Sequence, residues 1–239
     1  MLGTNPRGNR MNIAGSEPRR ARRIFSDADL ERITAAVKEA EGKTAGEIVP
    51  CVVQRSDDYE EAVWRGGFLF GIVVFVGFAC VRRFTTAWLP VDFATAVLAA
   101  CVAGGGGMLL VQFIPALKRL FAGSSLIHRR VSQRAAEAFI TEEVFNTRDR
   151  TGILIFLSLL ERKVLVVGDA GINAKVGQQE WKGIVERVVS GMRNGRPAEG
   201  LIDAVQQSGV LLQRRGVEIR QDDTDELGNS PRLEDDPQP

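Results

Sequence analysis

Three acidic residues stand at the ends of apolar runs, and their side chains are the ones best placed for chemistry. Glu47 opens one run, Asp149 precedes a second and Asp169 follows a third. If the first two runs form parallel strands and the third folds back antiparallel, all three carboxylates lie at one end of a sheet. Carboxylate oxygens are ligands that Ca²⁺ and Mg²⁺ prefer. The sequence therefore predicts a Ca²⁺ or Mg²⁺ site formed by Glu47, Asp149 and Asp169.

The same acids also have ordinary structural uses. Asp169 would suit the start of a following helix, Asp149 an Asx turn, and Glu47 an ion pair with Arg148 or Arg150. The two arginines flank Asp149, and a guanidinium group can grip a phosphate. A metal-dependent phosphatase that uses Arg148 and Arg150 is therefore the alternative function, although arginines beside an acid are commoner as surface ion pairs.

The sequence offers no convincing nucleophile or general base for such an enzyme. Ser158 and Ser190 have no base at a recognisable spacing, and the single histidine, His128, is followed by two arginines. A solvated helix position is the better interpretation of His128. The absence weighs against catalysis, so a binding or accessory role is favoured over a weak phosphatase.

A short hairpin must position two of the three acids. The runs Gly152–Leu159 and Lys163–Gly168 are rich in Ile, Leu and Val, and only residues 160–162 separate them. This pattern predicts two antiparallel strands joined by a tight turn. An earlier run, 48–54, predicts the first strand, in which Pro50 favours an edge position or a bulge.

Helices are predicted on both sides of these strands. Ser26 caps the first, which ends near Gly42, and apolar residues at helical spacing indicate others over 125–145, 176–192 and 197–212. The order is helix, strand, interrupted helical crossover, two strands and two helices. It predicts a small α/β sandwich.

Two apolar segments interrupt the crossover. Residues 66–81 contain no charged side chain, and residues 93–114 are apolar except for Thr95 and Gln112. Their lengths predict a transmembrane hairpin. The alternative, two buried helices of a larger soluble core, would need more protein to cover them.

The hairpin has further features of membrane helices. Trp64 and Trp88 lie at segment ends, where interfacial aromatics belong. Gly67 and Gly71 form a pair of small residues that favours close helix packing, and the glycine run 104–107 predicts a packing surface or a bend.

Flanking charges predict the orientation of the hairpin. The connecting loop carries two arginines, whereas more basic residues lie outside the hairpin: Arg55, Arg65, Lys118, Arg119, Arg129, Arg130 and Arg134. The positive-inside rule then puts both termini in the cytoplasm, with the hairpin in the cell's inner membrane. The lone Cys51 outside the apolar segments agrees with a reducing compartment.

The composition divides the chain further. Residues 1–23 form a basic arm and residues 216–239 an acidic tail, both predicted to be disordered. The predicted sandwich comprises residues 24–63 and 116–215, with the hairpin region 64–115 inserted between them. A net charge of +1 argues against a nucleic-acid binder with a broad basic face.

Several short motifs resemble those of the TPM-domain family. Residues 40–48, AEGKTAGEI, resemble its AE-xx-T-x-GEI signature. Residues 147–155, TRDRTGILI, resemble its T-x-x-R-N-G-V-L-I segment, with Thr151 where the family commonly has Asn. Glu161-Arg162 and residues 168–172, GDAGI, resemble its turn and its G-D-x-G-I. The resemblance covers about residues 24–58 and 120–215.

This resemblance implies an α/β sandwich, and the inserted hairpin is similar to that of the family's membrane-protein branch. Some members bind divalent cations, especially calcium, and some plant members are credited with weak acid phosphatase activity. Others are accessory proteins in photosystem II repair or with a neurotransmitter receptor. The expected function is thus a membrane-anchored, cation-binding accessory or assembly factor for a membrane complex, with the phosphatase as the alternative.

Overall fold

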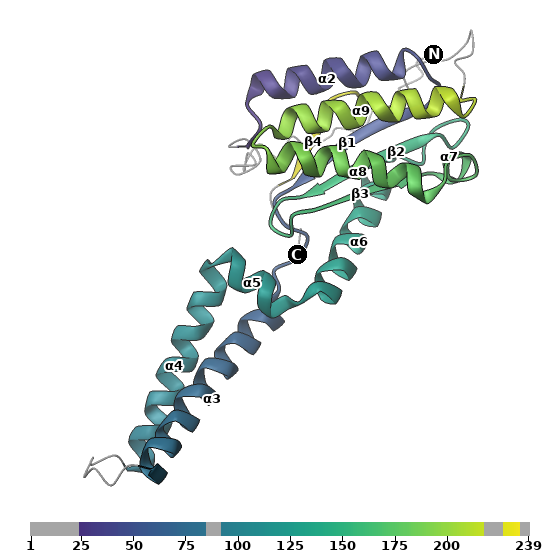
Figure 1. Cartoon of the computed structure of the whole chain (residues 1–239). Coiled ribbons are helices and arrows are strands. Elements are labelled where there is room, and N and C mark those ends of the chain that lie inside the picture. Colours follow the sequence, from purple (N-terminus) through teal and green to yellow (C-terminus); the bar gives the residue numbers. More distant parts are fainter. Residues whose placement is uncertain (1–23, 85–91, 218–226, 235–239) are drawn as a thin grey trace, which may run out of the picture.

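A computed structural model describes residues 24–84, 92–217 and 227–234. The predicted basic arm, Trp88 and part of the acidic tail lie outside these residues. The bounds of the elements, shown in Figure 1, are α2 (Asp27–Glu41), β1 (Glu47–Val53), α3 (Glu60–Phe84), α4 (Phe93–Phe113), α5 (Pro115–Ala122), α6 (Ser124–Thr141), β2 (Gly152–Ser158), β3 (Lys163–Gly168), α7 (Ala170–Asn173), α8 (Gln178–Arg193), α9 (Pro197–Arg214) and β4 (Arg232–Glu234).

The four strands form one mixed sheet in the order β3-β2-β1-β4. β1 and β2 are parallel, with Glu47 opposite Gly152, and β2 and β3 form the predicted antiparallel hairpin. β4 pairs with β1 only along Cys51–Val53. β1 is therefore an interior strand and not the edge strand that Pro50 favours, although Pro50 itself lies just outside the stretch that pairs with β4.

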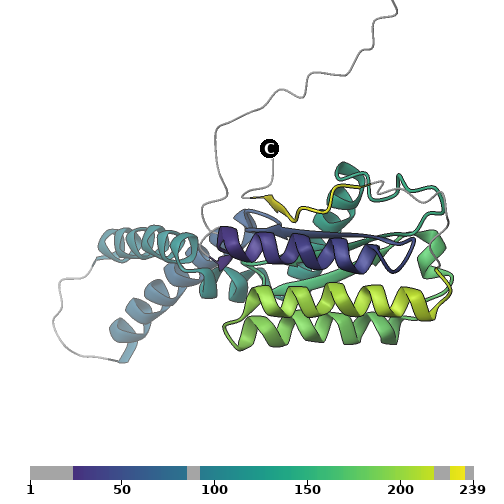
Figure 2. The ribbon, with the colours of Figure 1, turned by 90° about the horizontal axis from the view of Figure 1, so that it is seen from above.

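Helices cover both faces of the sheet, which makes the predicted α/β sandwich. Figure 2 shows α2, α8 and α9 on one face and α6 on the other. The larger core lies between the sheet and the helices α2, α8 and α9. It includes Ile48 and Ile153 of the strands and Leu201 of α9. The second core lies under α6 and includes Cys51, Leu154 and Phe156. β1 and β2 are buried along their whole length because both of their faces are covered.

The first helix begins where its capping residue predicts. The Ser26 hydroxyl accepts a hydrogen bond from the Asp29 amide, and the Asp29 carboxylate accepts one from the Ser26 amide. This reciprocal capping box satisfies two amides at the helix start. The hydrogen bonds from Ser26 lower the pKa of Asp29 below its usual range.

The inserted hairpin projects from the sandwich as two long apolar helices, α3 and α4 (Figure 1). Both are long and apolar enough to cross a membrane, and only 11% of the apolar stretch of each is buried within the chain. Most of their apolar surface is therefore not covered by this chain.

Glycines set the close approach of α3 and α4. A Cβ added to Gly67 would lie 3.1 Å from the Gly104 carbonyl oxygen, and one added to Gly107 would lie 2.6 Å from the Phe70 ring. A Cβ on Gly105 or Gly106 would meet no atom within 4 Å. The small pair at Gly67 thus packs as predicted, whereas only half of the 104–107 run serves that contact.

Two features of the chain were not predicted. The predicted helix over 125–145 is found as α6, but a further helix, α5, precedes it, because Pro115 starts α5 and Gly123, with φ of 78°, separates α5 from α6. The acidic tail is not disordered throughout: Arg232–Glu234 form β4, and Val217 is buried in the larger core. Three strand residues among acids and turn residues carry too little periodicity to be recognised.

Candidate functional site

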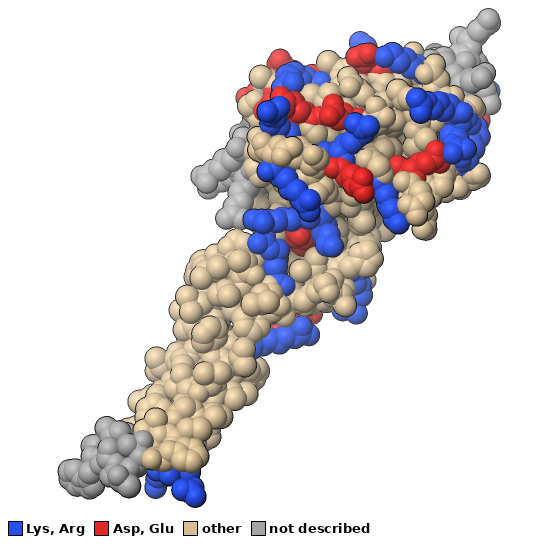
Figure 3. All heavy atoms as spheres, in the orientation of Figure 1, with Lys and Arg blue, Asp and Glu red and all other residues tan. Residues whose placement is uncertain are grey.

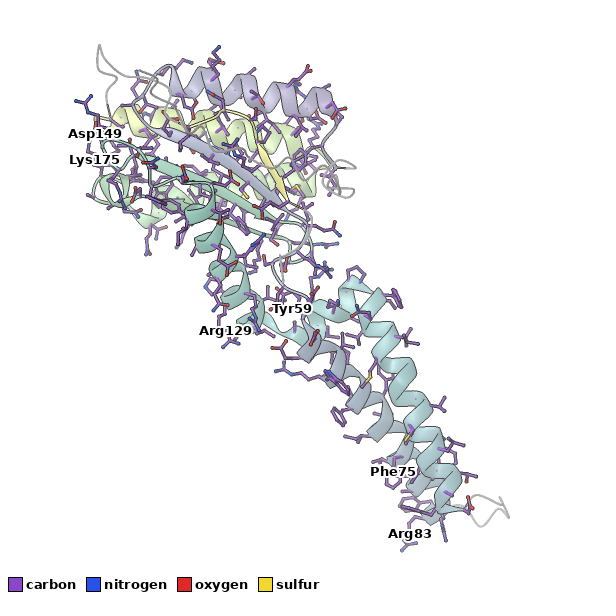
Figure 4. The ribbon with its side chains drawn as sticks, turned by 180° about the vertical axis from the view of Figure 1, so that it is seen from behind. Tyr59, Phe75, Arg83, Arg129, Asp149 and Lys175 are labelled. Carbon is purple, nitrogen blue, oxygen red and sulfur yellow. The ribbon has the colours of Figure 1, made fainter. Side chains whose placement is uncertain are left out.

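The end of the sheet remote from the hairpin brings the predicted acids to one place. Glu47 starts β1 opposite Gly152, and the Asp169 amide donates to the Gly152 carbonyl at 2.9 Å. Asp149 lies at the same end, far from Phe75 and the other hairpin residues labelled in Figure 4. The three acids therefore lie at the sheet end away from the hairpin, as strand direction predicts. We call this region, residues 147–152 and 168–173 with Glu47, the distal end.

The Asp169 carboxylate already has two partners at the distal end. It lies 2.7 Å from Arg150 Nε and accepts a hydrogen bond from the Ala170 amide at 2.6 Å, which caps α7. The carboxylate side chain is only 5% exposed, whereas the Arg150 side chain is 55% exposed. A largely buried acid is thus neutralised by a cation that reaches it from the solvent side.

The loop before β2 is fixed from within. The Thr147 hydroxyl accepts from the Thr151 amide at 2.9 Å, and the Thr151 hydroxyl donates to the Ala45 carbonyl at 2.8 Å. Arg150 adopts a left-handed φ of 55° between them. A Cβ on Gly171 would lie 2.4 Å from the Asp149 carbonyl oxygen, so a glycine is needed for α7 to lie against this loop. Thr151, in place of the family's Asn, makes its own bond to the loop before β1.

The arrangement at the distal end does not fit a bound cation as it stands. Among the described residues, no three His, Cys, Asp or Glu side chains gather so as to hold a metal ion. Asp169 is held by Arg150, whose positive charge occupies the side of the carboxylate that a cation would need. A cation could use this acid only after the guanidinium moves away.

The two arginines of the alternative phosphate site, Arg148 and Arg150, have different surroundings. Arg150 bonds Asp169 and lies over the Phe145 ring, 5.9 Å from its centroid. Arg148 is exposed on the same loop. The guanidinium of Arg150 is therefore used in neutralising an acid of its own chain.

The opposite end of the sheet contains a buried polar cluster that the sequence did not predict. The Glu161 carboxyl, in the turn between β2 and β3, accepts hydrogen bonds from the Ser56 amide and the Tyr59 hydroxyl, each at 2.8 Å, and from the Ser158 hydroxyl. The two serine hydroxyls also lie 2.9 Å apart. All four residues are at most 7% exposed. We call this cluster the joint, because it ties the β2–β3 turn to the segment that enters α3.

Tyr59 shows how firmly the joint is held. Its φ of 55° lies in the left-handed region, which costs a bulky residue roughly 1–2 kcal/mol. Its side chain is 1% exposed, and burial together with the nearby Glu161 raises the pKa of its hydroxyl. The hydrogen bond to Glu161 and the burial of the ring offset the strain, so the α3 entry is fixed in one geometry.

Basic side chains of α5 extend the joint toward the hairpin. Arg119 donates to the Leu160 carbonyl at 2.9 Å. Lys118, only 5% exposed, donates to the Asp58 carbonyl at 3.1 Å and to Gln112 at 3.2 Å, and its burial lowers its pKa. The turn of the sheet, the entry to α3 and the exit from α4 are thus connected by hydrogen bonds.

One sequence signal could have revealed the joint. Ser158 and Glu161 stand three residues apart across a tight turn, the spacing at which a hydroxyl can reach a carboxylate. Their partners, Ser56 and Tyr59, are more than a hundred residues away in the chain, as the separations of 102 and 105 show. A single sequence gives no sign that Ser56 and Tyr59 join this cluster.

Comparisons with known proteins agree with the fold. The family model described as TPM domain matches residues 117–210, which confirms the family resemblance from α5 into α9. The chain is similar in structure to the BA42 protein from the psychrophilic bacterium Bizionia argentinensis, solved by NMR. The TM-score is 0.54 at 18% identity, over 87% of this chain and 94% of that one. At that identity the likeness shows the fold alone. No curated protein matches the sequence.

Proposed function

From the premise that residues 117–210 form a TPM domain, we propose that this protein is a membrane-anchored accessory factor for a membrane complex. The α3–α4 hairpin is its anchor, and the sandwich is a binding module held in a fixed orientation relative to the bilayer. Both termini and the sandwich lie on the cytoplasmic side of the inner membrane. The observation that carries the proposal is the exposed apolar surface of the hairpin.

That surface has the dimensions and the charge pattern of a membrane segment. Figure 3 shows a tan arm without charged atoms along most of its length, with Lys and Arg at its tip and where it meets the sandwich. The 21 residues of α4 span roughly 32 Å at 1.5 Å per residue, against about 30 Å of bilayer hydrocarbon. An apolar surface of this size is costly in water, and lipid is the cover that its charge-free length fits.

The charges at the two ends of the hairpin support the orientation. Arg82 and Arg83 are the basic residues of the last turn of α3, at the tip. The opposite end carries Arg65 and the basic residues of α5 and α6. The larger number of basic residues on the sandwich side favours a cytoplasmic sandwich under the positive-inside rule.

The joint supports a role in which the position of the sandwich matters. A flexible tether would need no buried hydrogen bonds between the sheet and the entry to the hairpin, yet Glu161 accepts two, from the Ser56 amide and the Tyr59 hydroxyl. Because buried polar networks fix a single geometry, the distal end is held away from the lipid, where another protein can reach it.

Cation binding and phosphatase activity stay predictions. Binding of Ca²⁺ or Mg²⁺ by Glu47, Asp149 and Asp169 requires that Arg150 give up its ion pair. A phosphatase that uses Arg148 and Arg150 would need the same release. The geometry therefore favours the accessory role over the enzyme.

Fractionation of cells that produce the full chain tests the anchor. We expect the protein to remain in the membrane pellet after alkaline carbonate, which strips peripheral proteins, and to move to the soluble fraction only with detergent. Substituting Val102→Arg and Leu109→Arg in α4 should release it, because charges at mid-membrane are costly. The matched control is Ile140→Arg and Val210→Arg, at exposed sites on the sandwich. Complete extraction of the unaltered chain by carbonate would overturn the proposal.

A further inference from the structure

The last described segment of the chain, residues 227–234, binds to the sheet like a docked peptide. Residues 218–226 separate it from the rest of the sandwich in sequence. Its strand, β4, runs parallel to β1, with Arg232 opposite Cys51 and Glu234 opposite Val53. The Gln54 amide donates to the Glu234 carbonyl at 2.9 Å and completes the pairing.

The side chains of β4 alternate between two surroundings, as a strand requires. Arg232 and Glu234 point to the α6 face: Arg232 Nε lies 2.6 Å from Glu142, and Glu234 lies 2.5 Å from Arg134 Nη2. Leu233, between them, packs on the opposite core with α2, α8 and α9. The edge of β1 and the side of α6 therefore recognise a basic, an apolar and an acidic residue in succession.

Besides this pattern, the Asn229 side-chain amide donates to Glu41 at 2.6 Å, and Leu227 packs against the core under α6. Strand pairing extends over three residues, and no residue from 227 to 234 is fully buried. The ion pairs are partly solvated, with side-chain exposures of 16% to 26%. Beneath them, Cys51 is completely buried. A weakly held strand thus covers a strongly apolar one.

We propose that residues 227–234 are a displaceable clasp over a strand-acceptor site, and that the site takes an extended peptide with a basic, an apolar and an acidic residue in succession. In the closed state the chain's own C-terminal segment fills the site. Once the clasp leaves, the edge of β1 can pair with such a segment of a partner by strand addition. This inference concerns a different edge of the sandwich from the distal end, and it holds whether or not that end binds a cation.

Cys51 provides the test, because it lies under the ion pairs of the clasp. The full chain with Cys80→Ala and Cys101→Ala keeps Cys51 as its single thiol. Reversing the clasp charges, with Arg232→Glu and Glu234→Arg, places like charges opposite Glu142 and Arg134. Alkylation of Cys51 follows the population of the open state, so we expect its rate to rise on the order of tenfold or more.

Charge reversal on α6 separates opening of the clasp from loss of the fold. Adding Arg134→Glu and Glu142→Arg to the reversed clasp restores both ion pairs, and the rate should fall back toward that of the parent. No acceleration in the reversed clasp, or an acceleration that the α6 changes fail to lower, would overturn the clasp.

A synthetic peptide of residues 227–234, with both ends capped, tests the acceptor site. Added to the chain with the reversed clasp, it should slow alkylation of Cys51, whereas a peptide with its arginine and final glutamate exchanged should not. Equal protection by both peptides, or by neither, would overturn the recognition pattern. In the parent chain the rate should not depend on protein concentration. A rate that falls as concentration rises would show that a second copy supplies the strand, and would overturn a clasp within one chain.

Discussion

Both ends of the sheet bury acidic side chains, and Asp169 at the distal end and Glu161 at the joint are satisfied in opposite ways. At the distal end, Asp169 pairs with Arg150, a cation whose side chain is 55% exposed. At the joint, Glu161 accepts hydrogen bonds from two hydroxyls and a backbone amide, all buried. One acid is matched by an exposed surface charge, and the other by buried groups of the framework.

This difference assigns the two ends different roles. Arg150 reaches Asp169 from the solvent side, so another cation or a partner's basic side chain can take its place. The donors around Glu161 belong to the buried framework, and loss of the carboxyl would leave them without their acceptor. The joint therefore fixes geometry, whereas the distal end is the place where binding can occur.

The largest effect is expected from removing the acid of the joint. Glu161→Ala leaves the Ser56 amide and the hydroxyls of Tyr59 and Ser158 without their acceptor, and we expect a loss of roughly 3 kcal/mol in the free energy of unfolding. Denaturant unfolding of the detergent-solubilised chain, followed by near-ultraviolet circular dichroism, measures it. Glu186→Ala, at an exposed position of α8, is the control and should change stability by less than about 0.5 kcal/mol. A loss below about 1 kcal/mol for Glu161→Ala would remove the contrast between the two ends.

A smaller effect is expected in the hairpin that the joint holds. Gly67→Ala puts a methyl group 2.5 Å from Met108 Cγ and 3.1 Å from the Gly104 carbonyl, so α3 and α4 must move apart. We expect a loss of about 1–3 kcal/mol, as for other overpacked contacts. Gly106→Ala is the matched change on the open side of α4 and should be neutral or stabilising, because Ala favours a helix. Denaturant unfolding followed by tryptophan fluorescence measures both variants. Equal midpoints for the two would contradict the observed helix contact.

The smallest effect on stability is expected at the distal end. Arg150→Gln removes the cation that neutralises the buried Asp169 and should cost about 1 kcal/mol, because the Ala170 amide still bonds the carboxylate and the arginine side of the pair is open to solvent. The same change frees Asp169, so Ca²⁺ or Mg²⁺ should raise the melting temperature of this variant more than that of the parent. Adding Asp169→Asn, which keeps a side-chain oxygen to cap α7, should abolish the gain. If the cations shift neither protein, the predicted site at Glu47, Asp149 and Asp169 fails.

The elements that the sequence predicted well are those whose patterns are local. The β2–β3 hairpin follows from two runs of branched apolar residues around a short turn, and α2 from Ser26 with an acid three residues later. Charge-free length alone outlined α3 and α4. The meeting of Glu47 and Asp169 at one sheet end followed from strand direction, which the helical crossover imposes.

What the sequence missed depends on contacts between distant parts of the chain. The charges of β4 pair with Arg134 of α6 and with Glu142 at the end of that helix, and no local pattern of the three strand residues predicts these contacts. The sequence offered Arg148 or Arg150 as a partner of Glu47 and did not predict the ion pair between Arg150 and Asp169, which forms where the backbone of Arg150 is left-handed. Glu161 looked like an ordinary turn residue because its donors come from the other side of the inserted hairpin.

The proposed placement of the hairpin in the bilayer, with the sandwich outside it, can be tested at one position. Cys101 is exposed on α4, and with Cys51→Ala and Cys80→Ala it becomes the single site for a spin label in the full chain. In liposomes we expect the label to be relaxed strongly by oxygen and weakly by a water-soluble nickel chelate, as in the hydrocarbon interior. A label at Ser190→Cys, exposed on α8, should show the reverse. Equal access of the nickel chelate to both labels would contradict the membrane anchor.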